Sequence, residues 1–522
     1  WAMPEHWETR EVPTRLAFVL LALAAALAFA NAWPDALVYD DKFFAAMRFQ
    51  LGPGDIQRYF TTDLWAASGL ESGLYRPLLL VSLALESRLY GDWLPGYHLD
   101  NIALHVAATL LVYGLLRKVL RMAAEPGAPS DFYALLAALL FAVHPIHTEV
   151  VNSIFNRSEL LVALASAGGL WWLLHFLYLR PGRAWLGLAL AYLFGLFARE
   201  SAVVLPALAV ALVLLLARGT WPSRIRQCLP ALWLLLPLIL YLALRAIAFS
   251  AAGPENQAGA DEAASISSVL GKTEPPRFAF LLDMAGVWGR SLWLMVWPHP
   301  LLLVRPDLPM LQDCAWLLAQ LALGVTAILR FRAGRPALLL GLAFFYIALL
   351  PSSRFFGITG GGLHVAERYL YTPSIGPAIA LSFGLRHLGR RLGPGTASVP
   401  LLLALLVALP LTWNRNSEWS SDVRLFESEY RRGHRGTDAL RLLSGALLGA
   451  GKLERAAALC DTVSLDQLHL SRFANNCGIA YSALGRIADA EAAFVRATDG
   501  KSPAPVMLAN LAQFYLRQGR RA

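Results

Sequence analysis

The stretch LAFVLLALAAALAFANAW at residues 16–33, followed by LVYDDK at residues 37–42, decides the fold class of this chain. The first run is apolar over nearly the whole length of about 20 residues that a helix needs to cross a bilayer. It is too long for a signal peptide and lacks a small-residue cleavage site, so we expect a retained span. Directly after it, Asp40 and Asp41 place two carboxylates at the edge of the span. Such charges often serve function, although Asp also caps helices at a solvated surface.

The composition is that of a polytopic membrane protein. Hydrophobic residues make up 57% of the chain and charged residues 16%, whereas a soluble domain carries about 25% charged residues. The formal net charge of +9 does not indicate nucleic-acid binding, because the basic residues gather in short loops between apolar runs. That arrangement is typical of cytoplasmic loops. The clusters lie at 117–121, 180–183, 218–226, 330–335 and 386–391.

These basic clusters set the predicted topology. With the N-terminus in the cytoplasm they predict eleven spans and an extracytoplasmic C-terminus. Segment 35–95 then forms an outer loop with juxtamembrane helices. Segment 278–304 forms an outer, partly embedded helix, because a crossing there would place the basic cluster 330–335 outside the cytoplasm. Segment 251–275 is polar and is expected to be mobile. The spans cover about 16–33, 97–116, 131–147, 159–179, two passes around 199–200, 229–248, 315–329, 336–350, 370–385 and 397–412.

After Trp413 the composition changes to that of a soluble helical region. Gly451, Gly485 and Gly519 recur at a spacing of 34 residues (485 − 451 = 34; 519 − 485 = 34), each in a similar setting. Between them, small residues stand where paired helices must approach closely. This period predicts tetratricopeptide repeats, and the last repeat stops after its first helix.

Three parts of the chain are therefore expected. A membrane domain covers 1–413, a linker 414–435, and the repeats 436–522. Two of the four cysteines, Cys460 and Cys477, fall in the repeat region. They either pair, if that region is extracytoplasmic, or remain buried thiols. The other two cysteines border apolar runs, and none of the four has metal-ligand spacing.

The unusual polar residues all fall on the outer side of this topology. Scattered structural polar residues would not share one face, so we expect a common outer site. Carboxylates, imidazoles and guanidiniums together suit an anionic lipid headgroup and a hydroxyl acceptor. Asp40 and Asp41 are the candidate catalytic residues. The candidate residues for binding the donor phosphate or the substrate are Arg76, His98, His144, His147, Glu149, Arg157, Glu367 and Arg368.

Each of these patterns also has a structural interpretation. His144 and His147 with Glu149 resemble metal ligands, but helix capping and hydrogen-bonded packing explain them as well, and no metal site is assigned. Arg199 and Glu200 could form an ion pair between neighbours. Arg157 and Arg368 are stronger candidates for binding the donor, because a guanidinium near the membrane surface needs an anion, and a lipid phosphate supplies one.

Several motifs resemble those of a known family, the eukaryotic transmembrane and tetratricopeptide-repeat O-mannosyltransferases and their bacterial relatives. The resemblance runs from about residue 36 to the end and differs at Arg199 and Arg354, where that family usually has Lys and Asn. The motifs are YDD at 39–41, YRPL at 75–78, the His98–Asn101–His105 spacing, HPIHTE at 144–149 with Arg157, PSS at 351–353, AERYLY at 366–371 with Pro373 and Ser374, and Arg415 and Asn416 with Trp419.

The resemblance implies an all-α fold, a GT-C membrane helix bundle followed by a tetratricopeptide-repeat α-solenoid. It also implies a sugar donor linked to a polyprenyl phosphate, and an acidic residue after the first span as the base. The sequence contains no nucleotide-binding motif, which fits a lipid-borne donor. We therefore expect a glycosyltransferase that moves a sugar, mannose by resemblance, to a hydroxyl, with protein Ser or Thr as the expected acceptor. No cofactor is required, although a divalent metal remains an alternative.

Two other functional classes compete with this one. A non-catalytic membrane scaffold would use the repeats to bind a protein partner, because repeat arrays are binding surfaces. A transporter would need charges near the bilayer midplane, whereas here they gather at one edge. The expected partners are membrane lipid, the lipid-linked sugar and a protein bound by the repeats, without nucleic acid. The expected location is a bacterial inner membrane, with the repeats in the periplasm.

Overall fold

The computed structural model describes residues 13–34, 36–42, 49, 51–65, 73–123, 131–250, 277–303, 309–352, 366–464, 470–499 and 503–520. Within these ranges the chain is helical and forms no β-strand, which confirms the all-α class. It divides into two compact units. The first is 1–301 with 307–417, and the second is 302–306 with 418–522. The predicted mobile loop 251–275, together with Ser353 and Arg354, lies outside the described residues.

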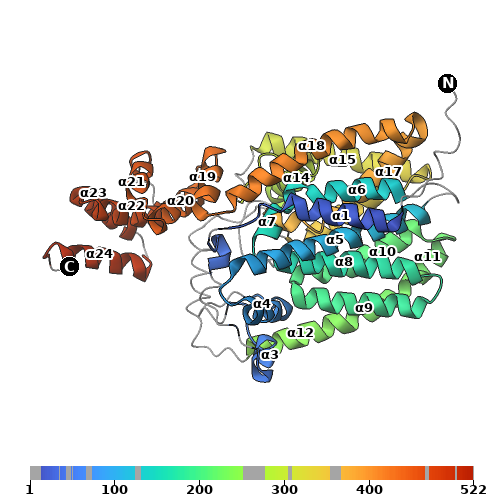
Figure 1. Ribbon diagram of the computed structural model, residues 1–522, viewed down its shortest axis with the longest axis horizontal. Coiled ribbons are helices and arrows are strands. Elements are labelled where there is room, and N and C mark those ends of the chain that lie inside the picture. Colours follow the sequence, from blue (N-terminus) through green and yellow to red (C-terminus); the bar gives the residue numbers. More distant parts are fainter. Residues whose placement is uncertain are drawn as a thin grey trace. The chain divides into compact units, whose positions relative to one another are not determined.

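The first unit is a bundle of long apolar helices. Helices α1, α5, α6, α8 and α9 run side by side (Figure 1). Its helices are α1 (Thr14–Ala28), α3 (Pro53–Tyr59), α4 (Pro77–Tyr90), α5 (Leu94–Met122), α6 (Asp131–Val143), α7 (Thr148–Asn152), α8 (Arg157–Phe176), α9 (Pro181–Ala198), α10 (Leu205–Leu216), α11 (Trp221–Cys228), α12 (Leu235–Ser250), α14 (Arg277–Trp293), α15 (Met310–Arg332), α16 (Ala337–Leu349), α17 (Ile375–Leu392) and α18 (Pro394–Glu418).

Short 3-10 helices connect many of these helices and carry half of the candidate residues, namely Asp40, Asp41, His147, Glu367 and Arg368. They are η2 (Tyr39–Asp41), η4 (Pro145–His147), η5 (Glu200–Val204), η6 (Leu229–Leu234), η8 (Leu350–Ser352) and η10 (Glu367–Leu370).

Close helix packing positions the segment that carries Glu367 and Arg368. Helices α16 and α17 touch where Gly341 faces Gly376. A Cβ atom added at Gly376 would lie 2.4 Å from the carbonyl oxygen of Gly341, so a larger residue does not fit there. This contact brings the start of α17 against α16, and η10 immediately precedes α17.

The predicted spans overlap described helices, but the number of crossings stays a prediction. The span predicted at 370–385 overlaps α17, which is not among the described helices that are long and apolar enough to cross. Six described helices are long and apolar enough to cross a membrane, or seven if the bent pair Asp131–Val143 and Pro145–Asn152 forms one span. Three shorter apolar helices cover further predicted spans, at Thr14–Ala28, Glu200–Leu216 and Ala337–Ser352. Segment 278–304, expected as an outer helix, contains most of α14.

Helix α18 continues beyond the predicted end of the membrane domain at 413. Its last turns bond to the end of α1. Trp413 Nε1 donates to the Leu27 carbonyl at 2.9 Å, and Asn416 Nδ2 donates to the Ala28 carbonyl at 2.9 Å. Asn416 also accepts a hydrogen bond from Asn152 of α7 at 2.8 Å. The first unit therefore includes the residues up to Ser417.

The second unit is a series of paired helices. They are α19 (Asp422–Arg431), α20 (Thr437–Gly449), α21 (Leu453–Asp461), α22 (Ser471–Ala483), α23 (Ile487–Thr498) and α24 (Pro505–Arg517), and α19 falls within the predicted linker. The three glycines spaced by 34 residues all adopt positive φ, between 67° and 72°, where the chain turns out of a helix. Cys460 and Cys477 form a disulfide between α21 and α22.

One side-chain contact recurs at the same 34-residue spacing. Arg486 lies over the ring of Tyr481, and Arg520 over the ring of Tyr515, with guanidinium-to-centroid distances of 4.3 and 4.7 Å. In each case an acidic residue of the preceding helix bonds both members. Asp461 plays this part for the first pair and Glu491 for the second. The sequence period therefore corresponds to a structural repeat.

Candidate functional site

The two neighbouring aspartates have different surroundings. Asp41 is fully buried and its carboxylate accepts three hydrogen bonds. The donors are the Ser153 hydroxyl at 2.8 Å, the Ile154 N–H at 2.9 Å and the Phe155 N–H at 3.1 Å. Burial raises the pKa of Asp41 to about 7, while these donors oppose the shift. Asp41 therefore fastens η2 to the turn between α7 and α8.

Asp40 is partly buried, and its side-chain carboxylate accepts no hydrogen bond from any described residue. Burial raises its pKa above the ordinary value, Arg368 and Arg76 lower it, and Glu149 raises it further. A carboxylate with an open lone pair and a raised pKa is suited to accept a proton. Of the two candidate catalytic residues, Asp40 has the environment of a base and Asp41 that of an anchor.

The residue before Asp40 adopts an unusual backbone conformation. Tyr39 has φ of 54°, in the left-handed region that residues other than glycine rarely occupy. Such a conformation costs roughly 1–3 kcal/mol and persists only where the surroundings hold it. The three hydrogen bonds to Asp41 supply that constraint two residues later. Backbone strain and anchoring therefore both fix where Asp40 lies.

Glu149 and Arg368, which both act on the charge of Asp40, form an ion pair with each other. Glu149 is completely buried at the start of α7. It accepts a hydrogen bond from the Arg368 guanidinium at 2.6 Å and from the Arg368 backbone N–H at 2.8 Å. The Arg368 side chain remains 20% exposed, so part of the guanidinium is accessible. Sequence reasoning named both residues, and the structure brings them together.

Two further Arg–Glu pairs lie in the same network, and they correct the expected neighbour pairing. Arg199 bonds not to Glu200 but to Glu159 of α8, at 3.0 Å. Glu200 instead accepts from the Arg76 guanidinium at 3.1 Å and from the Tyr75 N–H at 3.1 Å. Arg199 and Glu200 are adjacent in sequence, but the partner of Arg199 lies on α8, whereas those of Glu200 lie just before α4.

The ring of Tyr369 connects two of these pairs. The guanidinium carbon of Arg368 lies 5.1 Å from its centroid and that of Arg199 lies 5.2 Å from it. Both distances are within the range of cation–π attraction. We call the three pairs and this ring the charged site; its members are Arg76, Glu149, Glu159, Arg199, Glu200, Arg368 and Tyr369. Three guanidiniums there oppose three carboxylates, and Asp40 adds one further acid.

Arg157 belongs to a separate, buried network. Its guanidinium pairs with Glu86 of α4 and donates to Asn101 Oδ1 at 2.7 Å and to the Tyr97 carbonyl at 2.9 Å. Only 1% of the side chain is exposed. The structure thus joins α4, α5 and α8 through Arg157, and does not place it in the same ion pairs as Arg368. A role in binding the donor phosphate stays a prediction.

The candidate histidines are buried and engaged in packing contacts. His144 Nδ1 accepts from the Ile146 N–H at 3.2 Å and caps η4. His147 Nε2 lies 3.0 Å from the Ser374 hydroxyl, and its ring is 4.5 Å from that of Tyr371. Tyr371 in turn bonds His105 at 2.6 Å. These contacts correspond to the capping and packing interpretation. His98 is buried on α5 near the charge of Arg157.

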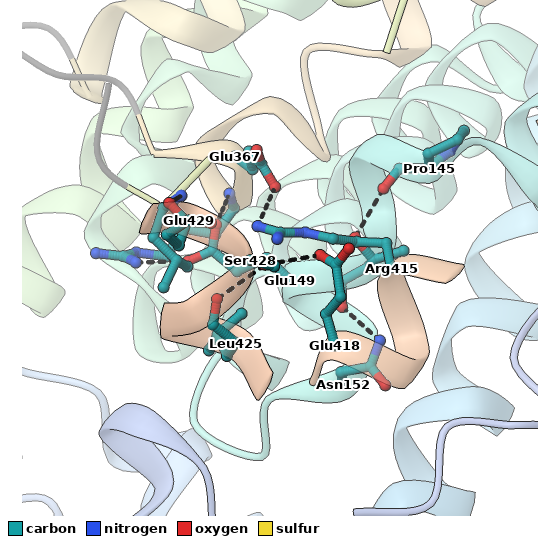
Figure 2. Close-up of polar contacts among 12 residues, drawn as sticks. Pro145, Glu149, Asn152, Glu367, Arg415, Glu418, Leu425, Ser428 and Glu429 are labelled. Carbon is teal, nitrogen blue, oxygen red and sulfur yellow. Dashed lines mark hydrogen bonds and ion pairs between the residues drawn. The ribbon is translucent and has the colours of Figure 1, made fainter. Parts of the chain in front are cut away.

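Glu367 is fully buried and pairs with a residue near the end of α18. Figure 2 shows the guanidinium of Arg415 directed at the Glu367 carboxylate, and the two are separated by 3.5 Å. Only 2% of the Arg415 side chain is exposed. Glu367 therefore holds η10 against α18, while its neighbour Arg368 turns toward Glu149.

Sequence reasoning missed the pairing that organises this region. It placed Glu159, Glu200 and Tyr369 among the outer polar clusters without identifying their partners, and it did not name Glu86 at all. Burial of an acid beside a basic residue gives a local signal, but the partner's identity depends on which helices touch. Among the described residues no group of three or more His, Cys, Asp or Glu side chains has metal-binding geometry.

The arrangement can accept one proton and stabilise one anion. Asp40 offers an open carboxylate, and the accessible part of Arg368 carries positive charge close to it. Guanidinium groups bind phosphate oxygens well because their N–H groups form a planar fork. The site is therefore suited to a reaction in which a hydroxyl loses a proton and a phosphate departs.

Comparison with known proteins gives relatives with one common description. No protein-family model matches the chain. Protein O-mannosyl-transferase Tmtc3 of Drosophila melanogaster is 26% identical over an alignment of 563 residues, gaps included, that covers 92% of this chain and 58% of that protein. Protein O-mannosyl-transferase TMTC4 of Mus musculus is 26% identical over 483 residues, 81% of this chain and 63% of that protein. Human protein O-mannosyl-transferase TMTC1 is 34% identical over 154 residues, 28% of this chain and 17% of that protein.

These relatives are longer than the chain, which spans 58%, 52% and 63% of three that match most of it. The matches nevertheless extend over most of the chain, including the first unit that holds the charged site. They confirm the resemblance that the motifs indicate: this chain is a relative of the TMTC protein O-mannosyl-transferases.

Proposed function

We propose that this chain is an integral membrane glycosyltransferase of GT-C type that moves a sugar from a polyprenyl-phosphate donor to a hydroxyl acceptor. The observation that carries the proposal is the environment of Asp40. This carboxylate has no hydrogen-bond donor among the described residues, and its charge is felt by Arg368, Glu149 and Arg76. The relatives' names favour mannose as the sugar and a protein hydroxyl as the acceptor.

The proposed reaction is a single displacement. The acceptor oxygen forms a bond to the anomeric carbon of the sugar while the bond from that carbon to the phosphate oxygen breaks. Asp40 takes the proton of the attacking hydroxyl, and the electron pair of the broken bond stays on the departing phosphate. One displacement inverts the configuration at the anomeric carbon.

The charged site would stabilise the departing phosphate. Arg368 contributes the accessible part of its guanidinium, and the neighbouring Arg76 lies 11% exposed beside Glu200. The paired glutamates hold these guanidiniums in fixed positions, so little reorganisation is needed as negative charge develops. The scheme uses only the chain's own residues and the two substrates, which are the lipid-linked donor and the hydroxyl acceptor.

We further propose that the site faces the extracytoplasmic side and that the helical pairs of the second unit are tetratricopeptide repeats that bind a protein acceptor or partner. The disulfide between Cys460 and Cys477 supports an oxidising compartment. The 34-residue recurrence of the Tyr481–Arg486 and Tyr515–Arg520 contacts supports the repeat assignment. A bacterial inner membrane with periplasmic repeats fits both the disulfide and the repeat assignment.

The test is Asp40→Asn in the full chain, measured with a lipid-linked mannose donor and a Ser/Thr-containing acceptor. Asn keeps the size of Asp but accepts no proton, so transfer should fall by about 10²–10⁴-fold. Asp92→Asn is the matched control, because Asp92 is exposed and lies outside the charged site. Transfer at the wild-type rate by the Asp40 variant would make the non-catalytic scaffold the leading function.

A further inference from the structure

A small pocket lies beside the charged site and shares Glu159 and Tyr369 with it. It is formed where α8, η5, the end of α16 with η8, and the chain after η10 meet. Half of its lining residues carry a hydroxyl, and one carries a carboxylate. The lining residues are Glu159, Val162, Ser166, Ser201, Val204, Ala348, Ser352, Tyr369, Thr372 and Pro373.

Two of these hydroxyls are buried without a hydrogen-bond partner. Thr372 is 5% exposed, and its Oγ1 atom bonds no described group. The buried Oγ atom of Ser201 likewise has no partner among the described residues. Leaving buried hydroxyls unpartnered is costly, and native proteins rarely do so without water or a ligand. By contrast, Ser352 Oγ already donates to the Leu349 carbonyl at 2.8 Å.

The size and polarity of the pocket restrict what can occupy it. It has room for about one water-sized group, so a whole sugar ring does not fit. An anion would be repelled by the Glu159 carboxylate, and an apolar group would leave the two hydroxyls without a hydrogen-bond partner. A hydroxyl both donates and accepts, so one such group can serve Thr372, Ser201 and a carboxylate together.

The pocket is also connected to the charged site through shared residues. Glu159 pairs with Arg199, and Tyr369 contacts both Arg199 and Arg368. A group held beside Tyr369 would therefore support the ring and the ion pair that position Arg368. This connection gives the pocket a route by which its occupancy affects the donor site.

We propose that this pocket is a hydroxyl-binding site in which Thr372 and Ser201 hold a single hydroxyl beside Glu159. This O–H group is either that of a resident water molecule or a hydroxyl of the sugar on the lipid-linked donor. The second source rests on the proposed glycosyltransferase function, whereas the first does not.

The experiment removes the hydroxyls with little change of shape. Thr372→Val and Ser201→Ala, singly and combined, are compared with wild type in the purified full chain for thermal unfolding in detergent. The KM for polyprenyl-phosphate mannose and its deoxy analogues is measured on the same samples. Thr109→Val is the matched control, since Thr109 is buried but donates to the carbonyl of His105 in its own helix at 2.9 Å.

The two sources of the hydroxyl give different results. With a resident water, both variants unfold at a lower temperature than wild type and bind all donors like wild type. With the donor's hydroxyl, the variants raise the KM for the mannose donor by roughly 2- to 10-fold, but not the KM for the one analogue that lacks the bound hydroxyl.

One result overturns the proposal. If Thr372→Val and Ser201→Ala unfold at the same or a higher temperature than wild type and leave every KM unchanged, the pocket holds no hydroxyl. Failure of the proposed function is distinguished from this outcome, because it appears as undiminished transfer by Asp40→Asn while the unfolding measurement still tests the pocket.

Discussion

Glu149 holds Arg368 at two points, through the guanidinium at 2.6 Å and through the backbone N–H at 2.8 Å. One buried carboxylate thus fixes both where η10 runs and where its positive charge lies. The two residues are 219 positions apart in sequence, so this contact brings the HPIHTE and AERYLY motifs together in one site.

The first prediction concerns this contact. Glu149→Gln keeps one acceptor but removes the charge, so the position of the Arg368 guanidinium should loosen. Charge-assisted hydrogen bonds contribute about 1.5–3 kcal/mol, and we expect kcat/KM for transfer to fall by about 10- to 100-fold. Glu427→Gln serves as control, because Glu427 pairs with the exposed Arg431 in the second unit. Equal activity of the two variants would show that this pair does not position the donor.

The second prediction separates the two aspartates. Asp41→Asn turns an amide toward one of the three donors that now bond the carboxylate, so the free energy of unfolding should fall by roughly 1–3 kcal/mol. Asp40→Asn should leave it nearly unchanged, because no described residue donates to the Asp40 carboxylate. Thermal unfolding of both variants in detergent gives the comparison. The anchor assignment fails if Asp41→Asn unfolds like wild type yet transfers no sugar.

The third prediction concerns pH. Burial raises the pKa of Asp40, and a general base works only when deprotonated. The rate should therefore be complete above the raised pKa and be lost as the pH falls through it. We expect the acidic midpoint of the kcat/KM profile to lie above the ordinary Asp value of 3.8. The residual activity of Asp40→Asn should lack this acidic limb. A limb at or below the ordinary value would point to a different base.

The fourth prediction tests Arg157 as a structural residue. Arg157→Met leaves Glu86 buried and unpaired, which typically costs 3–5 kcal/mol, so the variant should unfold at a much lower temperature. Combining it with Glu86→Leu removes the unpaired charge and should recover much of that loss. If instead Arg157→Met stays as stable as wild type but binds the lipid-linked donor poorly, Arg157 contacts the phosphate as its position in the sequence predicts.

The fifth prediction concerns the second unit. The disulfide closes a loop with a sequence separation of 17, so replacing both Cys460 and Cys477 by Ser should lower the unfolding free energy of this unit by about 3 kcal/mol. Because both cysteines are buried, the cell envelope is first denatured without reductant, and a thiol reagent should then label these two cysteines only after reduction. Labelling without reduction would place the repeats in a reducing compartment and overturn the proposed topology.

Much of the fold could be predicted because membrane helices and repeats leave periodic, local signals. Apolar length marks the helices from α1 to α18, and the spacing of Gly451, Gly485 and Gly519 marks the second unit. The all-α class and the family resemblance followed from these signals and from short motifs. Nothing local shows how many of the helices cross, because α16 is short for a span and α17 ends in the basic residues Arg390 and Arg391.

The site was predicted as a set of residues but not as a set of pairs. Asp40 and Asp41 look equivalent in sequence, and only the turn at Ser153 distinguishes them. Likewise, Arg199 has an acidic neighbour in Glu200, yet bonds Glu159 on another helix. A long-range pair depends on which helix ends meet, and one sequence holds no record of that.

The hydrogen bonds at the end of α18 determine where this protein can be divided. The apolar sequence ends near Trp413, which makes that position an attractive place to truncate the chain. A fragment ending there would lack Arg415 and Asn416, and with them the partner of Glu367 and the Asn416 hydrogen bond to the Ala28 carbonyl at the end of α1. A fragment that keeps residues through Ser417 retains both contacts. Loss of transfer in the shorter fragment would therefore be wrongly credited to the missing repeats, when four residues of the membrane unit had been removed with them.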